Sequence, residues 1–109
     1  MKKKTLTFDE LREKNLRRCG EVFPRLESQS LNDLAMLAFA NLGEACSYLV
    51  GMKKGEPITP GDIGEELADA VIFIDLLCSR LGIELGLYVW EKFNRISDIM
   101  GSEHYLEMV

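Results

Sequence analysis

The chain has 109 residues, of which 47% are hydrophobic and 28% are charged, and its net charge is -5. This composition is too apolar for intrinsic disorder, and the length predicts a single domain over residues 1–109. The acidic balance argues against phosphate-backbone binding, which needs a clustered excess of Lys and Arg, so we expect no nucleic-acid partner.

Three further features predict where the protein works. The basic run Lys2–Lys4 is followed by no apolar stretch of signal-peptide length, which predicts a solvated tail. The most apolar window, 67–77, contains two aspartates and is shorter than the ~20 residues that span a bilayer. The cysteines, Cys19, Cys46 and Cys78, are odd in number and far apart, so we expect free thiols, with Cys46 and Cys78 acting as small hydrophobes. These features predict a cytoplasmic protein without a membrane segment.

Three helix starts share a hydroxyl residue followed three positions later by a carboxylate, a pattern in which the two residues cap free N–H groups reciprocally. The pairs are Thr7 with Glu10, Ser30 with Asp33, and Thr59 with Asp62. Four helices are expected, over about 8–19, 31–52, 60–81 and 84–99, with Gly82 as the left-handed cap of the third. Since no alternating run of strand length appears, the chain is predicted to be all-α.

The second and third predicted helices each carry an apolar stripe at core-facing spacing. The stripes are Leu31, Leu34, Ala35, Ala38, Leu42, Ala45 and Leu49, and Ile63, Leu67, Ala70, Val71, Ile74, Leu77, Cys78 and Leu81. A short turn lets these helices pack antiparallel, which predicts an antiparallel bundle of about four helices. Because a helix with apolar residues on two faces needs partners on both, we expect a homo-oligomer, either dimer or tetramer.

Polar residues one helical turn apart lie beside these stripes. They are Asn41 and Glu44 on the second helix, and Glu66 and Asp69 on the third. In an antiparallel hairpin the two pairs would meet, and two like charges ~4 Å apart repel by about 4 kcal/mol at an effective dielectric near 20. A divalent cation removes that repulsion, and oxygen ligands without His or Cys favour Mg²⁺, or Mn²⁺, and a phosphorylated substrate. The alternative is that these are solvent-facing charges on amphipathic helices.

The segment 64–77, with Glu66-Leu67-Ala68-Asp69 near its start, resembles the MazG-like nucleotide pyrophosphohydrolases. The likeness continues over 81–85, 91–94 and 101–102, and upstream over 7–12 and 43–46, so it covers nearly the whole chain. The resemblance implies an all-α enzyme in which an ExxE pair and an ExxD pair hold Mg²⁺. It also implies that a nucleoside triphosphate substrate is split into a monophosphate and pyrophosphate.

By this resemblance Glu66 and Asp69 match the ExxD pair, and Glu44 matches the second member of the ExxE pair. Asn41 occupies the position of the first member. An Asn carbonyl can ligate Mg²⁺, but it carries no charge and cannot act as a general base. The resemblance implies that Glu44 orients or deprotonates the attacking water. The implied phosphate contacts on the last helix are Lys92 and Asn94.

Three kinds of function remain open from the sequence. The first is a Mg²⁺-dependent pyrophosphohydrolase acting on a nucleoside or deoxynucleoside triphosphate. The second is a nucleotide-binding or interaction module that has lost turnover because Asn41 replaces a carboxylate. The third is a structural helical bundle without chemistry.

Overall fold

The computed structural model describes residues 5–23, 25 and 28–107, and within them it contains four α-helices and no strand. The helices are α1 (Phe8–Val22), α3 (Leu31–Lys53), α4 (Pro60–Arg80) and α5 (Leu85–Met100). The prediction of an all-α fold is confirmed. The predicted tail at Lys2–Lys4 lies outside the described residues. Predicted boundaries agree within one residue, except that α1 continues three residues past Cys19, to Val22, where the N–H of Phe23 donates to the carbonyl of Cys19.

Side-chain caps begin the first three helices as predicted. Ser30 with Asp33 and Thr59 with Asp62 form reciprocal capping boxes, whereas the Thr7 hydroxyl accepts from the backbone N–H of Glu10 at 3.1 Å. The end of α4 is also as predicted. Gly82 is left-handed, with φ of 68°, and the N–H of Ile83 donates to the carbonyl of Cys78 at 2.8 Å, closing the helix.

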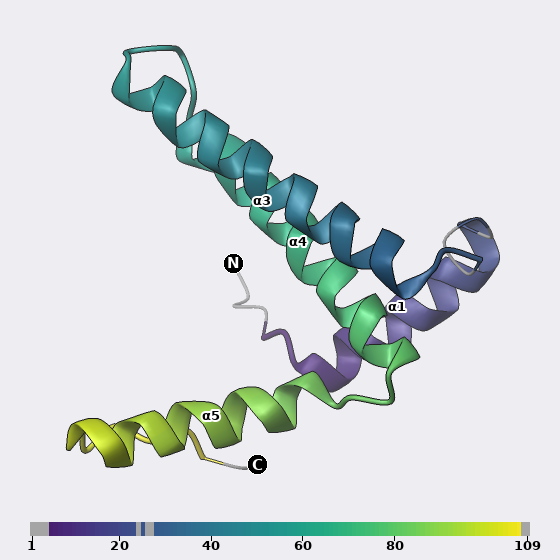
Figure 1. Ribbon diagram of the computed structural model, residues 1–109, viewed down its shortest axis with the longest axis vertical. Coiled ribbons are helices and arrows are strands. Elements are labelled where there is room, and N and C mark those ends of the chain that lie inside the picture. Colours follow the sequence, from purple (N-terminus) through teal and green to yellow (C-terminus); the bar gives the residue numbers. More distant parts are fainter. Residues whose placement is uncertain (1–4, 24, 26–27, 108–109) are drawn as a thin grey trace.

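The helices α3 and α4 form an antiparallel hairpin, which Figure 1 shows as the longest arm of the molecule. The loop between them folds back onto Gly51, whose carbonyl accepts from the N–H groups of Lys54 and Glu56, both at 3.0 Å. A Cβ at Gly51 would collide with the Glu56 carboxylate and would lie 2.7 Å from Cδ1 of Ile58. A side chain at Gly51 would therefore have to displace the ends of these two loop side chains.

The predicted apolar stripes are only partly buried. In α3, Leu34, Ala38 and Ala45 are buried against α4, and in α4 the buried apolar residues include Ala70 and Cys78. The other stripe residues include the exposed Leu31, Ala35, Leu42, Leu49, Leu67, Val71 and Leu81. Placing whole stripes in the core was therefore wrong for a single chain, because each stripe is wider than the face that one partner helix covers.

The three cysteines are free, as expected, but they differ in environment. Cys19 and Cys78 are buried, and burial raises the pKa of the Cys78 thiol, an effect that the positive charge of Arg12 partly offsets. Cys46 is exposed, so its expected role as a small buried hydrophobe is wrong within one chain.

A buried polar network fixes α1 across α4. Asp75 of α4 is 1% exposed, and its two carboxylate oxygens accept from Nε of Arg12 at 3.0 Å and from Nδ2 of Asn15 at 3.1 Å. Asn15 also donates to the carbonyl of Ile72 at 3.0 Å, and Arg12 donates to that of Ile83 at 2.6 Å. Because each carboxylate oxygen of Asp75 accepts a hydrogen bond, the buried charge is compensated.

The last helix leaves the hairpin and carries the end of the chain on its surface. Figure 1 shows α5 diverging from α3 and α4, with α1 at its base. Nε1 of Trp90 donates to the carbonyl of Leu106 at 2.9 Å, and the Ser97 hydroxyl donates to the carbonyl of His104 at 2.6 Å. These bonds hold the segment 102–107 against α5.

Candidate functional site

The α3–α4 hairpin brings Glu44 and Asp69 to the same height. Glu44 lies nine residues before Lys53, the last residue of α3, and Asp69 lies nine residues after Pro60, the first residue of α4. Nine residues of helix correspond to about 13.5 Å, so both side chains leave their helices at a similar distance from the loop. The equal count gives the two residues similar heights, and the predicted meeting of the two polar pairs stays a prediction.

Helical register also puts the two carboxylates on one flank. Each directly precedes an alanine that is buried between the helices, Ala45 in α3 and Ala70 in α4. Moving one residue toward the N-terminus rotates the side-chain direction by about 100° around the helix axis. Whether this rotation is clockwise or counterclockwise, seen from one end of the hairpin, depends on the direction in which the chain runs. Because α3 and α4 run in opposite directions, both turns lead to the same side of the hairpin. Asn41 and Glu66 lie one turn away from Glu44 and Asp69, respectively.

Among the described residues, no Lys, Arg or His forms an ion pair with the carboxylates of this flank. Glu44 and Asp69 are exposed and Glu66 is half-buried. The ion pairs among the described residues join Arg12 to Asp75 and Arg17 to Glu13, and they involve none of the three. Nowhere in the described part of the chain do three His, Cys, Asp or Glu side chains lie together as metal ligands. The oxygen donors suit Mg²⁺ in kind, but the exposed carboxylates would have to rotate inward to share an ion.

Asn41 presents the least satisfied polar group at this site. Its side-chain Nδ2 is buried and has no hydrogen-bond partner. A buried donor without an acceptor destabilises a protein by ~1–3 kcal/mol, so an acceptor entering the site would recover that energy. The carboxylate expected here from the family pattern would offer acceptors only. Asn41 therefore suits an oxygen-bearing ligand or water more than it replaces a charged metal ligand.

The predicted phosphate contacts lie on another helix. Lys92 lines a shallow apolar groove of about 360 Å³ on α5, together with Tyr88 and Phe93. Asn94 is occupied at both ends of its amide: Nδ2 donates to the carbonyl of Leu106 at 3.0 Å, and Oδ1 accepts from its N–H at 2.8 Å. Asn94 therefore holds the C-terminal segment. Because α5 diverges from the hairpin, one chain does not bring these residues to the four hairpin positions (Figure 1).

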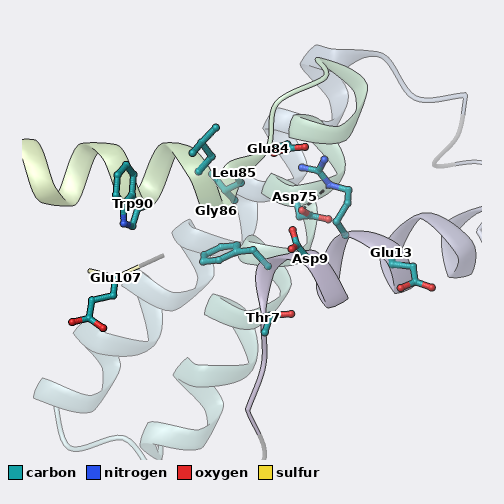
Figure 2. A pocket seen from close by; sticks show the side chains of 12 residues that line it. Thr7, Asp9, Glu13, Asp75, Glu84, Leu85, Gly86, Trp90 and Glu107 are labelled. Atoms are coloured by element: carbon teal, nitrogen blue, oxygen red, sulfur yellow. Dashed lines mark hydrogen bonds and ion pairs between the residues drawn. The ribbon is translucent and has the colours of Figure 1, made fainter. Parts of the chain in front are cut away.

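Another pocket lies at a different place in the fold. It measures about 440 Å³ and lies between the starts of α1 and α5 and the C-terminal half of α4. Figure 2 shows Asp9 and Asp75 near each other at one end, and Trp90 and Glu107 at the other. None of the predicted site residues lines it. Its exposed carboxylates would repel a triphosphate, so the pocket does not fit the phosphates of the predicted substrate.

Sequence reasoning missed the network around Asp75. The available signal was a carboxylate inside the apolar run 70–78, because an ionised group is buried only when it is paired. Arg12 and Asn15, three residues apart on α1, are the matching partners. Their distance in sequence, about sixty residues from Asp75, hid the pairing.

Comparison with known proteins identifies no relative. No family model matches the chain, and neither a curated protein nor a solved structure matches it. Membership of the MazG-like family therefore stays a prediction.

Proposed function

We propose that the chain is a Mg²⁺-dependent pyrophosphohydrolase that splits a nucleoside triphosphate into a monophosphate and pyrophosphate. The observation that carries the proposal is that Glu44 and Asp69 share one flank and one height of the α3–α4 hairpin with no basic partner. Repulsion between such carboxylates favours binding of a divalent cation. The resemblance of the surrounding sequence to MazG-like proteins adds the substrate class.

The residues of this flank would supply the groups that hydrolysis needs. Glu44, Glu66 and Asp69 would hold Mg²⁺, with the carbonyl of Asn41 as a neutral donor. When bound, Mg²⁺ supplies positive charge to the phosphate oxygens and to the leaving pyrophosphate. Glu44 accepts a proton from the attacking water, whose oxygen bonds to the α-phosphorus as the bridging bond between the α-phosphorus and the leaving pyrophosphate breaks. Nδ2 of Asn41, which is buried and has no acceptor, would donate to a phosphate oxygen once its side chain turns toward the flank.

Lys92 remains a proposed phosphate contact, because a lysine ammonium meets phosphate as a point charge. It would need α5 to lie differently relative to the hairpin than it does in one chain. Asn94 would first have to release Leu106. We therefore place less of the substrate binding on α5 than the family resemblance implies.

The direct test is pyrophosphate release from a panel of ribonucleoside and deoxyribonucleoside triphosphates. With Mg²⁺ or Mn²⁺ we expect pyrophosphate and monophosphate in equal amounts from at least one nucleotide, and background rates in EDTA. Release of orthophosphate and nucleoside diphosphate in equal amounts would contradict the assigned bond cleavage. No turnover of any nucleotide above the EDTA rate would reject the hydrolase.

A nucleotide-binding module without turnover is the second candidate. The observation that favours it is Asn41, whose buried and unpartnered amide stands where the family pattern has a carboxylate. Such an amide can bind a phosphate oxygen but cannot take a proton from water. The same flank would then bind nucleotide and release it unchanged.

Replacing Asn41 by glutamate separates the two candidates. In the hydrolase, Asn41→Glu should raise turnover about 10-fold or more, because an added carboxylate strengthens the metal site. In the binding module, titration calorimetry should show that wild type binds nucleotide without hydrolysis, and only the variant should turn over. Ala40→Glu is the control, since it adds the same charge at the neighbouring exposed position. An equal effect of both variants would assign the gain to charge alone.

A further inference from the structure

The pocket between the starts of α1 and α5 is lined by more negative than positive charge, and we call it the acidic pocket. Among its lining side chains that the structure describes, the guanidinium of Arg12 is the one positive group. It bonds to the buried carboxylate of Asp75, so this pair adds little net charge. The remaining carboxylates of the lining are all exposed, at Asp9, Glu13, Glu84 and Glu107. A concave surface with one sign of charge concentrates ions of the opposite sign.

Three of these carboxylates have no partner in the described part of the chain. Glu13 pairs with Arg17 at 3.4 Å, but no ion pair or side-chain hydrogen bond joins Asp9, Glu84 or Glu107 to another described residue. Figure 2 shows Asp9 and Glu84 toward one end of the pocket and Glu107 toward the other. A ligand that meets all three therefore needs positive charge at both of its ends.

Two aromatic rings line the space between these ends. Trp90 is held in place by its Nε1, which donates to the carbonyl of Leu106 at 2.9 Å. Phe8 of α1 packs on Gly86 of α5, where even a Cβ would lie 3.0 Å from Cβ of Phe8. The face of a tryptophan attracts a cation more strongly than other rings do, within about 6 Å of its centre. Aromatic walls between acidic ends fit a ligand with an aliphatic middle.

The C-terminal segment fixes the far end of the pocket before any ligand enters. Asn94 donates to the carbonyl of Leu106 at 3.0 Å and accepts from its N–H at 2.8 Å. Glu107 follows directly, so these bonds keep its carboxylate at the pocket. A site whose groups are already in place loses less entropy on binding than a surface of mobile side chains does. This fixed end and the aromatic rings distinguish the acidic pocket from a solvated acidic surface.

We propose that the acidic pocket binds a linear aliphatic polyamine. One ammonium group meets Asp9 and Glu84, another meets Glu107, and the methylene chain between them lies on Trp90 and Phe8. An ammonium group has three donors, so it can serve two carboxylates at once. The volume of about 440 Å³ lies within the range of about 300–1,000 Å³ that is typical of small-molecule sites. The proposal goes beyond the hydrolase and does not depend on it, because no residue of the hairpin flank takes part.

A divalent metal ion fits the acidic pocket less well than a polyamine does. Within the described ranges, no three His, Cys, Asp or Glu side chains lie close enough together to ligate one ion. A small ion could therefore reach one end of the pocket but not both. The rings of Trp90 and Phe8 would also gain nothing from a hydrated metal, whereas they can cover methylene groups.

Fluorescence titration of the full chain with spermidine tests the proposal. Trp90 is the single tryptophan of the sequence, so its emission reports on this pocket and not on the hairpin flank. Without nucleotide or Mg²⁺, we expect a saturable change in emission. Butylamine, which has one ammonium group, should bind at least about tenfold more weakly, because it can meet only one end. No saturable change, or equal affinities for the two amines, would overturn the proposal.

Charge-neutral variants locate the binding groups. Glu107→Gln and Asp9→Asn should each weaken spermidine binding about threefold, as for exposed ion pairs, and together by about tenfold. The matched controls are Glu103→Gln and Glu10→Gln, which remove the same charge from the same two segments but outside the pocket. Their affinities, and that of Asp69→Ala, should match wild type. Equal losses in the controls would show diffuse attraction to an acidic protein and would contradict a site.

Variants of Trp90 separate its ring from its hydrogen bond. Trp90→Phe and Trp90→Leu both lose the bond to Leu106, but only the first keeps a ring. By titration calorimetry, Trp90→Phe should stay within about threefold of wild type and Trp90→Leu should bind at least about fivefold more weakly. Equal losses would reject the contact between cation and ring. Tighter binding of a peptide of three lysines than of spermidine would assign the pocket to a peptide and overturn the proposal.

Discussion

Replacing Asp69 by alanine is expected to lower pyrophosphate release by at least about 100-fold while leaving the fold intact. Losing one preorganised charge-stabilising group at a phosphoryl or acyl site typically lowers turnover by ~10²–10³, and Asp69 would also be one of only three carboxylates for the metal. Since the side chain is exposed, its removal leaves no cavity and relieves repulsion with Glu44 and Glu66. The thermal midpoint in EDTA should therefore stay unchanged or rise slightly.

The readouts are the steady-state rate with a preferred nucleotide and the Mg²⁺-induced shift in thermal midpoint. Wild type should be stabilised by Mg²⁺ and Asp69→Ala should not, because a ligand stabilises only the state that binds it. Glu91→Ala removes an exposed carboxylate on α5 and serves as the matched control, with a rate within about twofold of wild type. If Asp69→Ala kept more than half of the wild-type rate, the hairpin flank would not be the catalytic site.

Replacing Asp75 by alanine should strongly destabilise the fold. The substitution leaves the guanidinium of Arg12 and the amide of Asn15 without their acceptor in a buried position. Breaking a buried ion pair from one side typically destabilises by ~3–5 kcal/mol. Because Arg12 keeps 23% of its side chain exposed, we expect the lower part of that range. Urea unfolding followed by circular dichroism measures the difference.

Asp98→Ala is the matched control for this experiment. Asp98 also accepts a side-chain hydrogen bond, from the Tyr105 hydroxyl at 2.7 Å, but on an exposed surface, so its loss should destabilise by less than about 1 kcal/mol. A second change, Arg12→Met combined with Asp75→Leu, should regain part of the loss, since it removes the stranded charge together with its partner. Equal unfolding midpoints for Asp75→Ala and Asp98→Ala would show that the network does not hold α1 in place.

Local chemistry made the helix boundaries predictable. Thr59, Pro60 and Asp62 each favour a helix start for reasons contained within four residues, and α4 begins at Pro60. Gly82 ends the same helix because a left-handed residue is needed there. The pairing of α3 with α4 also followed from a short loop and matching apolar spacing. These features depend on residues that are close together in the sequence, so local patterns are enough to predict them.

Long-range packing was the part that local pattern could not supply. An apolar residue such as Leu42 is expected to favour burial, but the sequence does not say whether α4 or another molecule would cover it. The position of α5 depends on its contacts with α1, so the separation of Lys92 from Glu44 was not visible in their spacing. At the candidate site the sequence predicted the shared height of Glu44 and Asp69. It could not predict rotamers, which decide whether the carboxylates gather.

The tight contact of Gly51 with the loop makes the hairpin sensitive to the smallest possible side chain. A methyl group there would displace the ends of the Glu56 and Ile58 side chains, at the place where the loop packs on the end of α3. Slippage by a single residue would swing Glu44 through about 100°, from the acidic flank toward the buried seam. Gly51 lies seven residues after Glu44, about 10.5 Å along α3, so a contact outside the candidate site bears on the alignment of its carboxylates.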